Sequence, residues 1–300
     1  MPSKIEWTDE TWNPVFGCTK ASRGCTNCYA LAMAHRLERM GLAQYYGITK
    51  MRGDDLQWTG DVRVDESLLH KPLGWKKPKR IFVCSMADLF HRCVSDEFIC
   101  KVFDVVRAAP RHTFLMLTKR AERMARFFDK HVPDTPSNLW VGVTVEDQEQ
   151  ADKRIPYLTM INASVRFVSC EPLLGEVLIE KWLDQLQWVI VGGESGPAAR
   201  PMHPDWVNSL LWQCTDVQFM TSGKPIHFFF KQWGEWFPRE EWEWNPELIL
   251  PDDCDAYTNS KDTHVFVDGK RYYPVHRVGK KKAGRMIGGR TWDEFPQEAA

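Results

Sequence analysis

The sequence lacks any long hydrophobic run. No stretch of its 300 residues approaches the roughly 20 apolar residues that cross a bilayer. The first ten residues are charged and polar, whereas a signal peptide needs an apolar core. We therefore expect a cytoplasmic protein with no membrane partner. Hydrophobic residues still make up 43% of the chain, which is enough for a sizeable core.

The chain also lacks net charge, with 39 basic and 40 acidic residues, so it is not a general polyanion-coating protein. Charge is nevertheless uneven near the C-terminus. Residues 240–255 hold seven acidic and no basic side chains, and residues 270–290 hold eight basic and no acidic ones. Such a run is usually a solvated face, but it also attracts phosphate groups. A nucleotide or nucleic acid is therefore one candidate substrate.

Cysteine is sparse outside one loop. In a reducing compartment the nine cysteines are not expected to form disulfides. Six of them are scattered singly, which is typical of small buried hydrophobic residues. The other three, Cys18, Cys25 and Cys28, fall within eleven residues in the segment GCTKASRGCTNCYA. This cluster is the strongest candidate for a chemical site.

Short β-branched and aromatic runs alternate with helix-like segments, which predicts a βα-repeated fold with a mainly parallel sheet. We expect an α/β protein built on a partial (β/α) barrel of six or seven mainly parallel strands. The predicted strands span 12–16, 81–84, 113–117, 139–145, 165–168, 188–191 and 226–230. The predicted helices after the first one span 96–108, 121–128 and 205–214.

The sequence pattern divides the chain into two parts. Residues 1–235 form the predicted barrel, with residues 41–80 as an insertion after its first helix. Residues 236–300 form a small C-terminal extension, in which Asp268 and Gly269 favour the tight turn of a β-hairpin.

Polar side chains follow nearly every predicted strand. In parallel α/β folds, ligands bind at the C-terminal ends of the strands, so these residues are expected to share one rim. The repetition of ionisable groups at this rim favours a functional site over a set of unrelated solvated turns. Besides the cysteines, the rim residues are Ser85, Asp88, Lys119, Arg120, Glu146, Glu171, Gly192, Gly193, Glu194, Lys231, Gln232 and Trp233.

The three cysteines can be interpreted in three ways. Three thiolates can hold three irons of a four-iron cluster and leave the fourth iron open for an exchangeable ligand. Structural zinc normally takes a fourth protein ligand, which His35 or His91 could provide. A redox pair of Cys25 and Cys28 is the third interpretation, but it leaves Cys18 unused.

Eight segments spread over almost the whole chain resemble a phage- and mobile-element-associated family of three-cysteine proteins related to radical S-adenosylmethionine enzymes. They are GCTKASRGCTNCYA, FVCSMADLFH, APRHTFLMLTKR, LWVGVTVEDQ, RFVSCEPLLG, WVIVGGESGPAARPM, FFFKQWG and KKAGRMIGGRTWDE. The resemblance implies a radical-SAM-like partial barrel, a 4Fe-4S cluster on the three cysteines, and S-adenosylmethionine on the open iron. It also implies an electron donor, and it names neither a substrate nor a companion protein.

The cysteine loop departs from the wider superfamily in two ways. The usual spacing is C-x3-C-x2-C, whereas six residues separate Cys18 from Cys25 here. An aromatic residue commonly precedes the third cysteine, whereas here that residue is Asn27 and Tyr29 follows.

The resemblance implies roles for the rim residues by analogy of position. The expected contacts of S-adenosylmethionine are its amino group with Ser85 and Asp88, its carboxylate with Lys119 or Arg120, its ribose with Glu146, and close backbone approach at Gly192 and Gly193. The expected substrate side comprises Glu171, Glu194, Lys231 and Gln232, with Trp233 as a stacking wall. Structural roles such as helix capping or an ion pair explain several of these residues equally well.

The expected activity is radical chemistry on an unknown substrate. A related possibility is methyl or aminocarboxypropyl transfer with the same cofactors. The alternative from a different class is a non-catalytic binding protein, in which zinc or a cluster fastens the N-terminal loop.

Overall fold

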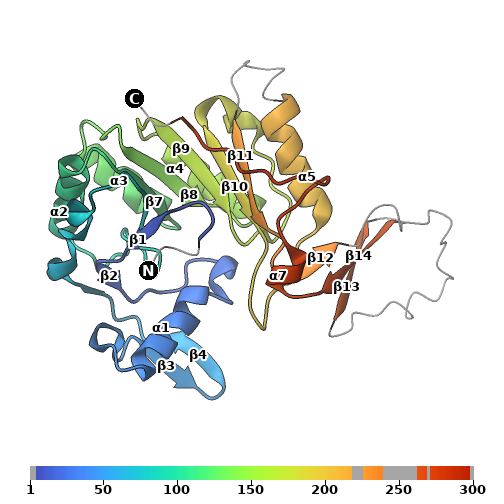
Figure 1. Cartoon of the computed structure of the whole chain (residues 1–300), viewed down its shortest axis with the longest axis horizontal. Coiled ribbons are helices and arrows are strands. Elements are labelled where there is room, and N and C mark those ends of the chain that lie inside the picture. Colours follow the sequence, from blue (N-terminus) through green and yellow to red (C-terminus); the bar gives the residue numbers. More distant parts are fainter. Residues whose placement is uncertain (1–4, 218–225, 239–261, 269–270, 298–300) are drawn as a thin grey trace.

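The computed structural model describes residues 5–217, 226–238, 262–268 and 271–297. Its centre is a seven-stranded parallel sheet in the order β1-β6-β7-β8-β9-β10-β11. The sheet curves into a partial barrel, as the sequence predicted (Figure 1). The strands are β1 (Glu10–Trp12), β6 (Arg80–Val83), β7 (Thr113–Thr118), β8 (Leu139–Thr144), β9 (Val165–Cys170), β10 (Trp188–Gly192) and β11 (His227–Gln232).

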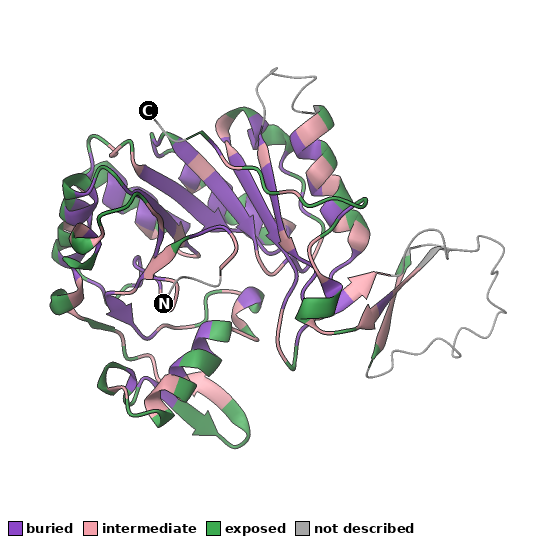
Figure 2. Cartoon of the chain, in the orientation of Figure 1, coloured by how far each residue is buried: buried purple, intermediate pink, exposed green. Residues whose placement is uncertain are grey.

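Nearly continuous apolar strands produce two cores because successive side chains point to opposite faces of a sheet. On one face, residues such as Val189 and Val191 pack in the large core that the helices share. On the other face, Phe82, Trp140 and Trp188 join a smaller, aromatic-rich cluster. The burial of both faces explains why these strands are hydrophobic throughout (Figure 2).

Helices connect successive strands of the barrel. The longer ones are α1 (Tyr29–Arg39), α2 (Asp96–Ala108), α3 (Ala121–His131), α4 (Gln148–Thr159) and α5 (Pro204–Trp212). Side chains cap three of them, since Ser95, Asp147 and His203 accept hydrogen bonds from first-turn N–H groups of α2, α4 and α5. Within the described ranges, no helix has the length and apolar content needed to cross a membrane.

The predicted first strand over residues 12–16 was wrong in its extent. The chain forms β1 at Glu10–Trp12 in the main sheet and then a separate strand, β2 (Val15–Phe16), which pairs with β5 (Arg63–Val64). Pro14 lies between them and has no N–H to donate to a sheet, which accounts for the break.

The predicted insertion after α1 contains a β-hairpin and short 3-10 helices. Strands β3 (Thr49–Arg52) and β4 (Asp55–Trp58) pair antiparallel and pack beside α1. The short helices are η2 (Ala43–Tyr45), η3 (Glu66–Leu68) and η4 (Lys71–Gly74).

The C-terminal region forms a second, three-stranded antiparallel sheet in the order β12-β14-β13. The antiparallel pair of β13 and β14 in this sheet is the hairpin that the sequence predicted. Its strands are β12 (Trp236–Pro238), β13 (Thr263–Asp268) and β14 (Arg271–Arg277), followed by α7 (Lys280–Ala283). The chain then returns to the barrel, where the N–H of Phe230 donates to the carbonyl of Trp292. The acidic segment 240–255 and Gly269 lie outside the described residues.

Gly142 in β8 tests the packing of the aromatic-rich face of the main sheet. A Cβ at this position would lie 2.6 Å from the ring of Phe167 on the adjacent strand, so Gly142→Ala overpacks the barrel. We expect a loss of about 1–3 kcal/mol in the free energy of unfolding, measured by urea denaturation. Gly74→Ala is the matched control, because a Cβ there meets nothing within 4 Å. Equal stability of both variants would contradict this packing.

Candidate metal site at the C-terminal rim of the barrel

The cysteine loop follows β2 and runs across the C-terminal ends of the barrel strands into α1. Its three thiols are free and partly buried, with Cys25 ending the 3-10 helix η1 (Arg23–Cys25) and Cys28 preceding α1. Two of the sulfurs face hydrogen-bond donors. The N–H of Ala21 lies 3.5 Å from Cys25 Sγ, and a guanidinium nitrogen of Arg120 lies 3.9 Å from Cys18 Sγ. Such donors stabilise sulfur in its thiolate form.

Burial is the main influence on the titration of two of these thiols. Burial raises the pKa of Cys18 to about 12, and nearby Cys28 contributes to the rise. Burial also raises the pKa of Cys28, with a further contribution from Cys25. At neutral pH these two thiols hold their protons, so binding of a metal must release them.

In the part of the chain that the structure describes, no three His, Cys, Asp or Glu side chains form a ready-made metal-binding group. The donor chemistry nevertheless fits an iron-sulfur centre, because three free thiols lie on one loop beside hydrogen-bond donors. Ligation by the three cysteines stays a prediction.

Asp88, which follows β6, holds the first part of the cysteine loop through Arg120. Its carboxylate accepts a 2.8 Å bond from the Arg120 guanidinium and a 2.7 Å bond from the Thr118 hydroxyl. The same guanidinium donates to the carbonyl and hydroxyl oxygens of Thr19, both at 3.0 Å. Asp88 therefore positions the residue directly after Cys18.

Glu146, which follows β8, holds the middle of the loop. Its side chain is fully buried and accepts bonds from Lys119 and Arg154, both at 2.7 Å. It also accepts a 2.6 Å bond from the Ser22 hydroxyl. Gly24 lies so close that a Cβ would stand 2.3 Å from the carboxylate, which explains the glycine before Cys25.

Glu194, which follows β10, holds the last part of the loop. It accepts a 2.9 Å bond from the Asn27 side chain and is paired with the guanidinium of Arg200 at 2.5 Å. Arg200 also donates to the backbone carbonyl of Arg23 at 3.0 Å. Glu194 thus positions the residue directly before Cys28.

A second polar group lies at the ends of β9 and β11. The Lys231 ammonium pairs with Glu171 at 2.8 Å, and the indole N–H of Trp7 and the hydroxyl of Ser169 donate to the same carboxylate at 3.2 and 3.1 Å. The Tyr29 hydroxyl, one residue beyond Cys28, donates to the backbone carbonyl of Ser85.

The remaining predicted residues, at the ends of β10 and β11, are buried. Gly193 allows the backbones after β10 and β11 to meet, since a Cβ there would stand 1.9 Å from the carbonyl oxygen of Trp233. Gly192 packs beside Glu171. Gln232 is buried against Gly193, and its side-chain oxygen has no hydrogen-bond partner among the described residues. The Trp233 ring packs against Phe230 and its indole donates to Met286.

The two histidines considered as zinc ligands are engaged elsewhere. His91 is buried, and its Nε2 lies 2.9 Å from the Thr19 hydroxyl. Burial and then the charge of Arg120 lower its pKa to about 4, so it is neutral. His35 contacts the hydroxyl of Thr49 at 3.2 Å.

Sequence reasoning missed two cations that pair with rim carboxylates, Arg154 and Arg200. Arg154 carried a usable signal, because it shares the apolar face of α4 with Ala151, Ile155 and Leu158 at helical spacing. A charge on a buried face requires a partner. Arg200 gave no comparable signal, because it lies in an irregular segment.

The fold and the loop define a class of protein: a partial (β/α) barrel that carries a three-cysteine loop at its C-terminal rim. The chain belongs to the family DUF5131, described as a protein of unknown function, whose model matches residues 2–296. No curated protein sequence matches it.

Among solved structures, the chain is similar to "Spore photoproduct lyase complexed with dinucleoside spore photoproduct". The TM-score is 0.40 and the sequence identity 7%, with 92% of this chain and 70% of the other covered.

The Glu146 contacts predict a large effect of Glu146→Gln. The variant leaves Lys119 and Arg154 without their buried counter-charge, so we expect a loss of about 3–5 kcal/mol in the free energy of unfolding. The milder Ser22→Ala should leave global stability nearly intact and speed amide hydrogen exchange in residues 19–25. Glu176→Gln is the control, because Glu176 is exposed. Unchanged exchange in Ser22→Ala would argue against the loop contact.

The same carboxylate predicts a pH dependence. Burial alone raises the pKa of Glu146, but Lys119 and Arg154 outweigh it and hold the pKa below its ordinary 4.5. A lowered folded-state pKa adds stability above the unfolded-state value, and that stability is lost as pH falls through the folded-state pKa. The stability difference between the parent chain and Glu146→Gln should therefore be largest above pH 4.5 and shrink in acid. Denaturation curves that show a constant difference would contradict this.

Proposed function

We propose that this chain is an iron-sulfur enzyme of the radical S-adenosylmethionine type. Cys18, Cys25 and Cys28 would hold a 4Fe-4S cluster with one iron open to S-adenosylmethionine. The observation that carries the proposal is the placement of three free thiols on one loop at the C-terminal rim. Parallel barrels bind their ligands at that rim. Reductive cleavage of S-adenosylmethionine to a 5′-deoxyadenosyl radical is the chemistry that such a cluster supplies when bound.

The protein's own residues would supply position and exclusion of water. Asp88, Glu146 and Glu194 fix the loop, so their carboxylates are already engaged by other side chains of the chain. The predicted contacts of Asp88 and Glu146 with S-adenosylmethionine would therefore require these groups to exchange partners. Ser85 and Lys119 lie at the same rim, and the Lys119 ammonium would also have to leave Glu146.

The group around Glu171 and Lys231 would face the substrate. Their ion pair is only partly buried. A paired carboxylate and ammonium can orient a polar substrate by exchanging one partner for it. The predicted substrate is a nucleotide or nucleic acid, and the predicted reductant is a separate electron donor.

A non-catalytic protein fastened by zinc remains the alternative from another class. Zinc would need a fourth ligand, and the neutral imidazole of His91, which contacts Thr19 in the cysteine loop, would have to give up that contact to provide it. Metal content separates the two functions.

Cys25→Ala, with Cys93→Ala as the matched control, tests the proposal. Cys93 is exposed and lies outside the loop. After anaerobic reconstitution, the parent chain and Cys93→Ala should be brown and contain about four irons per chain, whereas Cys25→Ala should lose iron and colour. One zinc per chain without visible absorbance would refute the iron-sulfur assignment.

A second assay addresses the chemistry. The reconstituted parent chain, reduced with dithionite, should release 5′-deoxyadenosine from S-adenosylmethionine, and Cys25→Ala should not. Release of methylthioadenosine instead would indicate aminocarboxypropyl transfer and refute the deoxyadenosyl step.

A further inference from the structure

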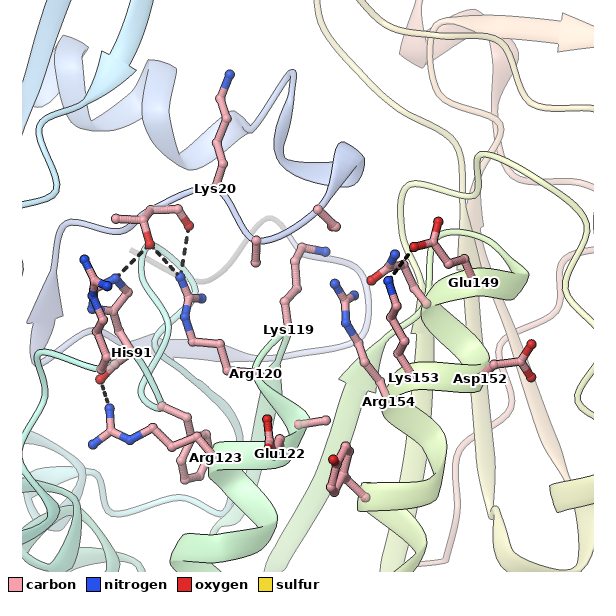
Figure 3. Close-up of a pocket in the computed structure, with 18 of the residues that line it drawn as sticks. Lys20, His91, Lys119, Arg120, Glu122, Arg123, Glu149, Asp152, Lys153 and Arg154 are labelled. Atoms are coloured by element: carbon pink, nitrogen blue, oxygen red, sulfur yellow. Dashed lines mark hydrogen bonds and ion pairs between the residues drawn. The ribbon is translucent and has the colours of Figure 1, made fainter.

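A large cavity lies on the side of the cysteine loop that faces α3 and α4 (Figure 3). Its volume is about 1210 Å³. One wall is the segment 19–23, which lies between Cys18 and Cys25. The other walls come from residues 90–92, from the start of α3 and from residues 149–157 of α4. None of the group around Glu171 and Lys231 lines it.

The cavity is lined by more basic than acidic side chains. Eight lysines and arginines face three aspartates and glutamates in the lining. Several of these cations are neutralised by partners, as Lys119 is by Glu146 and Lys153 by Glu149. Lys20 and Arg92 differ, because both are exposed and neither has a hydrogen bond or ion pair within the described ranges. These two charges are free for a ligand at the outer edge of the cavity, where Figure 3 shows the Lys20 side chain extending away from Lys119 and Arg120.

The start of α3 adds neutral donors to the same cavity. Its N-cap residue, Arg120, provides no side-chain cap, in contrast to Ser95, Asp147 and His203 at α2, α4 and α5, although α1 and α7 also lack one. The N–H groups of Ala121 and Glu122 consequently find no acceptor among the described residues. Free N–H groups at a helix N-terminus suit phosphate oxygens.

We propose that this cavity binds a phosphate-bearing ligand, and that its size favours a short nucleic acid strand over a single nucleotide. The volume exceeds the roughly 300–1,000 Å³ of most small-molecule pockets. Tyr157, a partly buried aromatic residue in the lining, offers a surface on which a base can stack. An acidic protein is a less fitting occupant, because recessed backbone N–H groups are reached more easily by a slender phosphodiester chain than by a folded surface.

The cavity shares Lys119 and Arg120 with the predicted contacts of S-adenosylmethionine, but a phosphate ligand there needs neither iron nor S-adenosylmethionine. Binding can therefore be measured on the metal-free full-length chain. Failure of the iron-sulfur assignment would leave the phosphate site standing, and the reverse also holds.

The test is fluorescence anisotropy of a labelled oligothymidylate with the parent chain and with the double variant Lys20→Ala/Arg92→Ala. The matched control is Lys50→Ala/Arg52→Ala, which removes one exposed lysine and one exposed arginine from β3, away from the cavity. Titrations between about 50 and 200 mM salt give the dependence of affinity on ionic strength. Urea denaturation verifies that both double variants fold.

We expect the cavity variant to bind at least tenfold more weakly than the parent. The slope of its log affinity against log salt concentration should be smaller in magnitude by about 1.4, because two phosphate contacts to a single strand are lost. The control should match the parent. Displacement of the oligonucleotide by ATP at similar concentration would also support a phosphate site and would identify free nucleotide as the source. Equal binding by the parent and the cavity variant would overturn the proposal. Polyglutamate that binds as tightly as the oligonucleotide, with the same dependence on Lys20 and Arg92, would overturn it in favour of an acidic protein.

Discussion

Three buried or nearly buried carboxylates bind the cysteine loop to the barrel, and the arrangement of the site depends on them. Asp88, Glu146 and Glu194 come from the ends of three different strands, and each contacts the loop beside a different cysteine, directly or through an arginine. Burial of a carboxylate is unfavourable unless a cation and hydrogen bonds compensate for it. The loop supplies part of that compensation through Ser22 and Asn27. The barrel therefore cannot reach its low-energy arrangement without placing the loop.

This constraint separates the surroundings of the loop into two regions with different chemistry. At one, the partly buried pair of Glu171 and Lys231 lies where a substrate would meet the rim. At the other, the segment 19–23 closes a cavity with unpaired cations and uncapped N–H groups. A ligand at the cavity and a substrate at the rim would contact the same loop from different directions, so occupancy of one region can influence the other through that loop.

The sequence predicted the elements better than their connections. Continuous apolar runs located six of the seven strands of the main sheet, because a strand that is covered on both faces is apolar along its whole length, whereas the predicted first strand shared only Trp12 with β1. The polar residues that follow each predicted strand also located the rim, because the C-terminal ends of parallel strands lie at the same edge of a sheet. The contact between Ser22 and Glu146 could not be predicted in the same way, because the two residues are 124 positions apart in sequence and meet only through tertiary packing. The return of the chain to β11 near Trp292 was missed for the same reason.

The most direct measurement is a crystal structure of the anaerobically reconstituted chain with anomalous diffraction at the iron and zinc absorption edges. The account predicts one iron-containing centre bonded to the sulfurs of Cys18, Cys25 and Cys28, with the Ser22–Glu146 and Asn27–Glu194 contacts retained. A zinc peak with a histidine as fourth ligand, or sulfurs that bind no common centre, would contradict it.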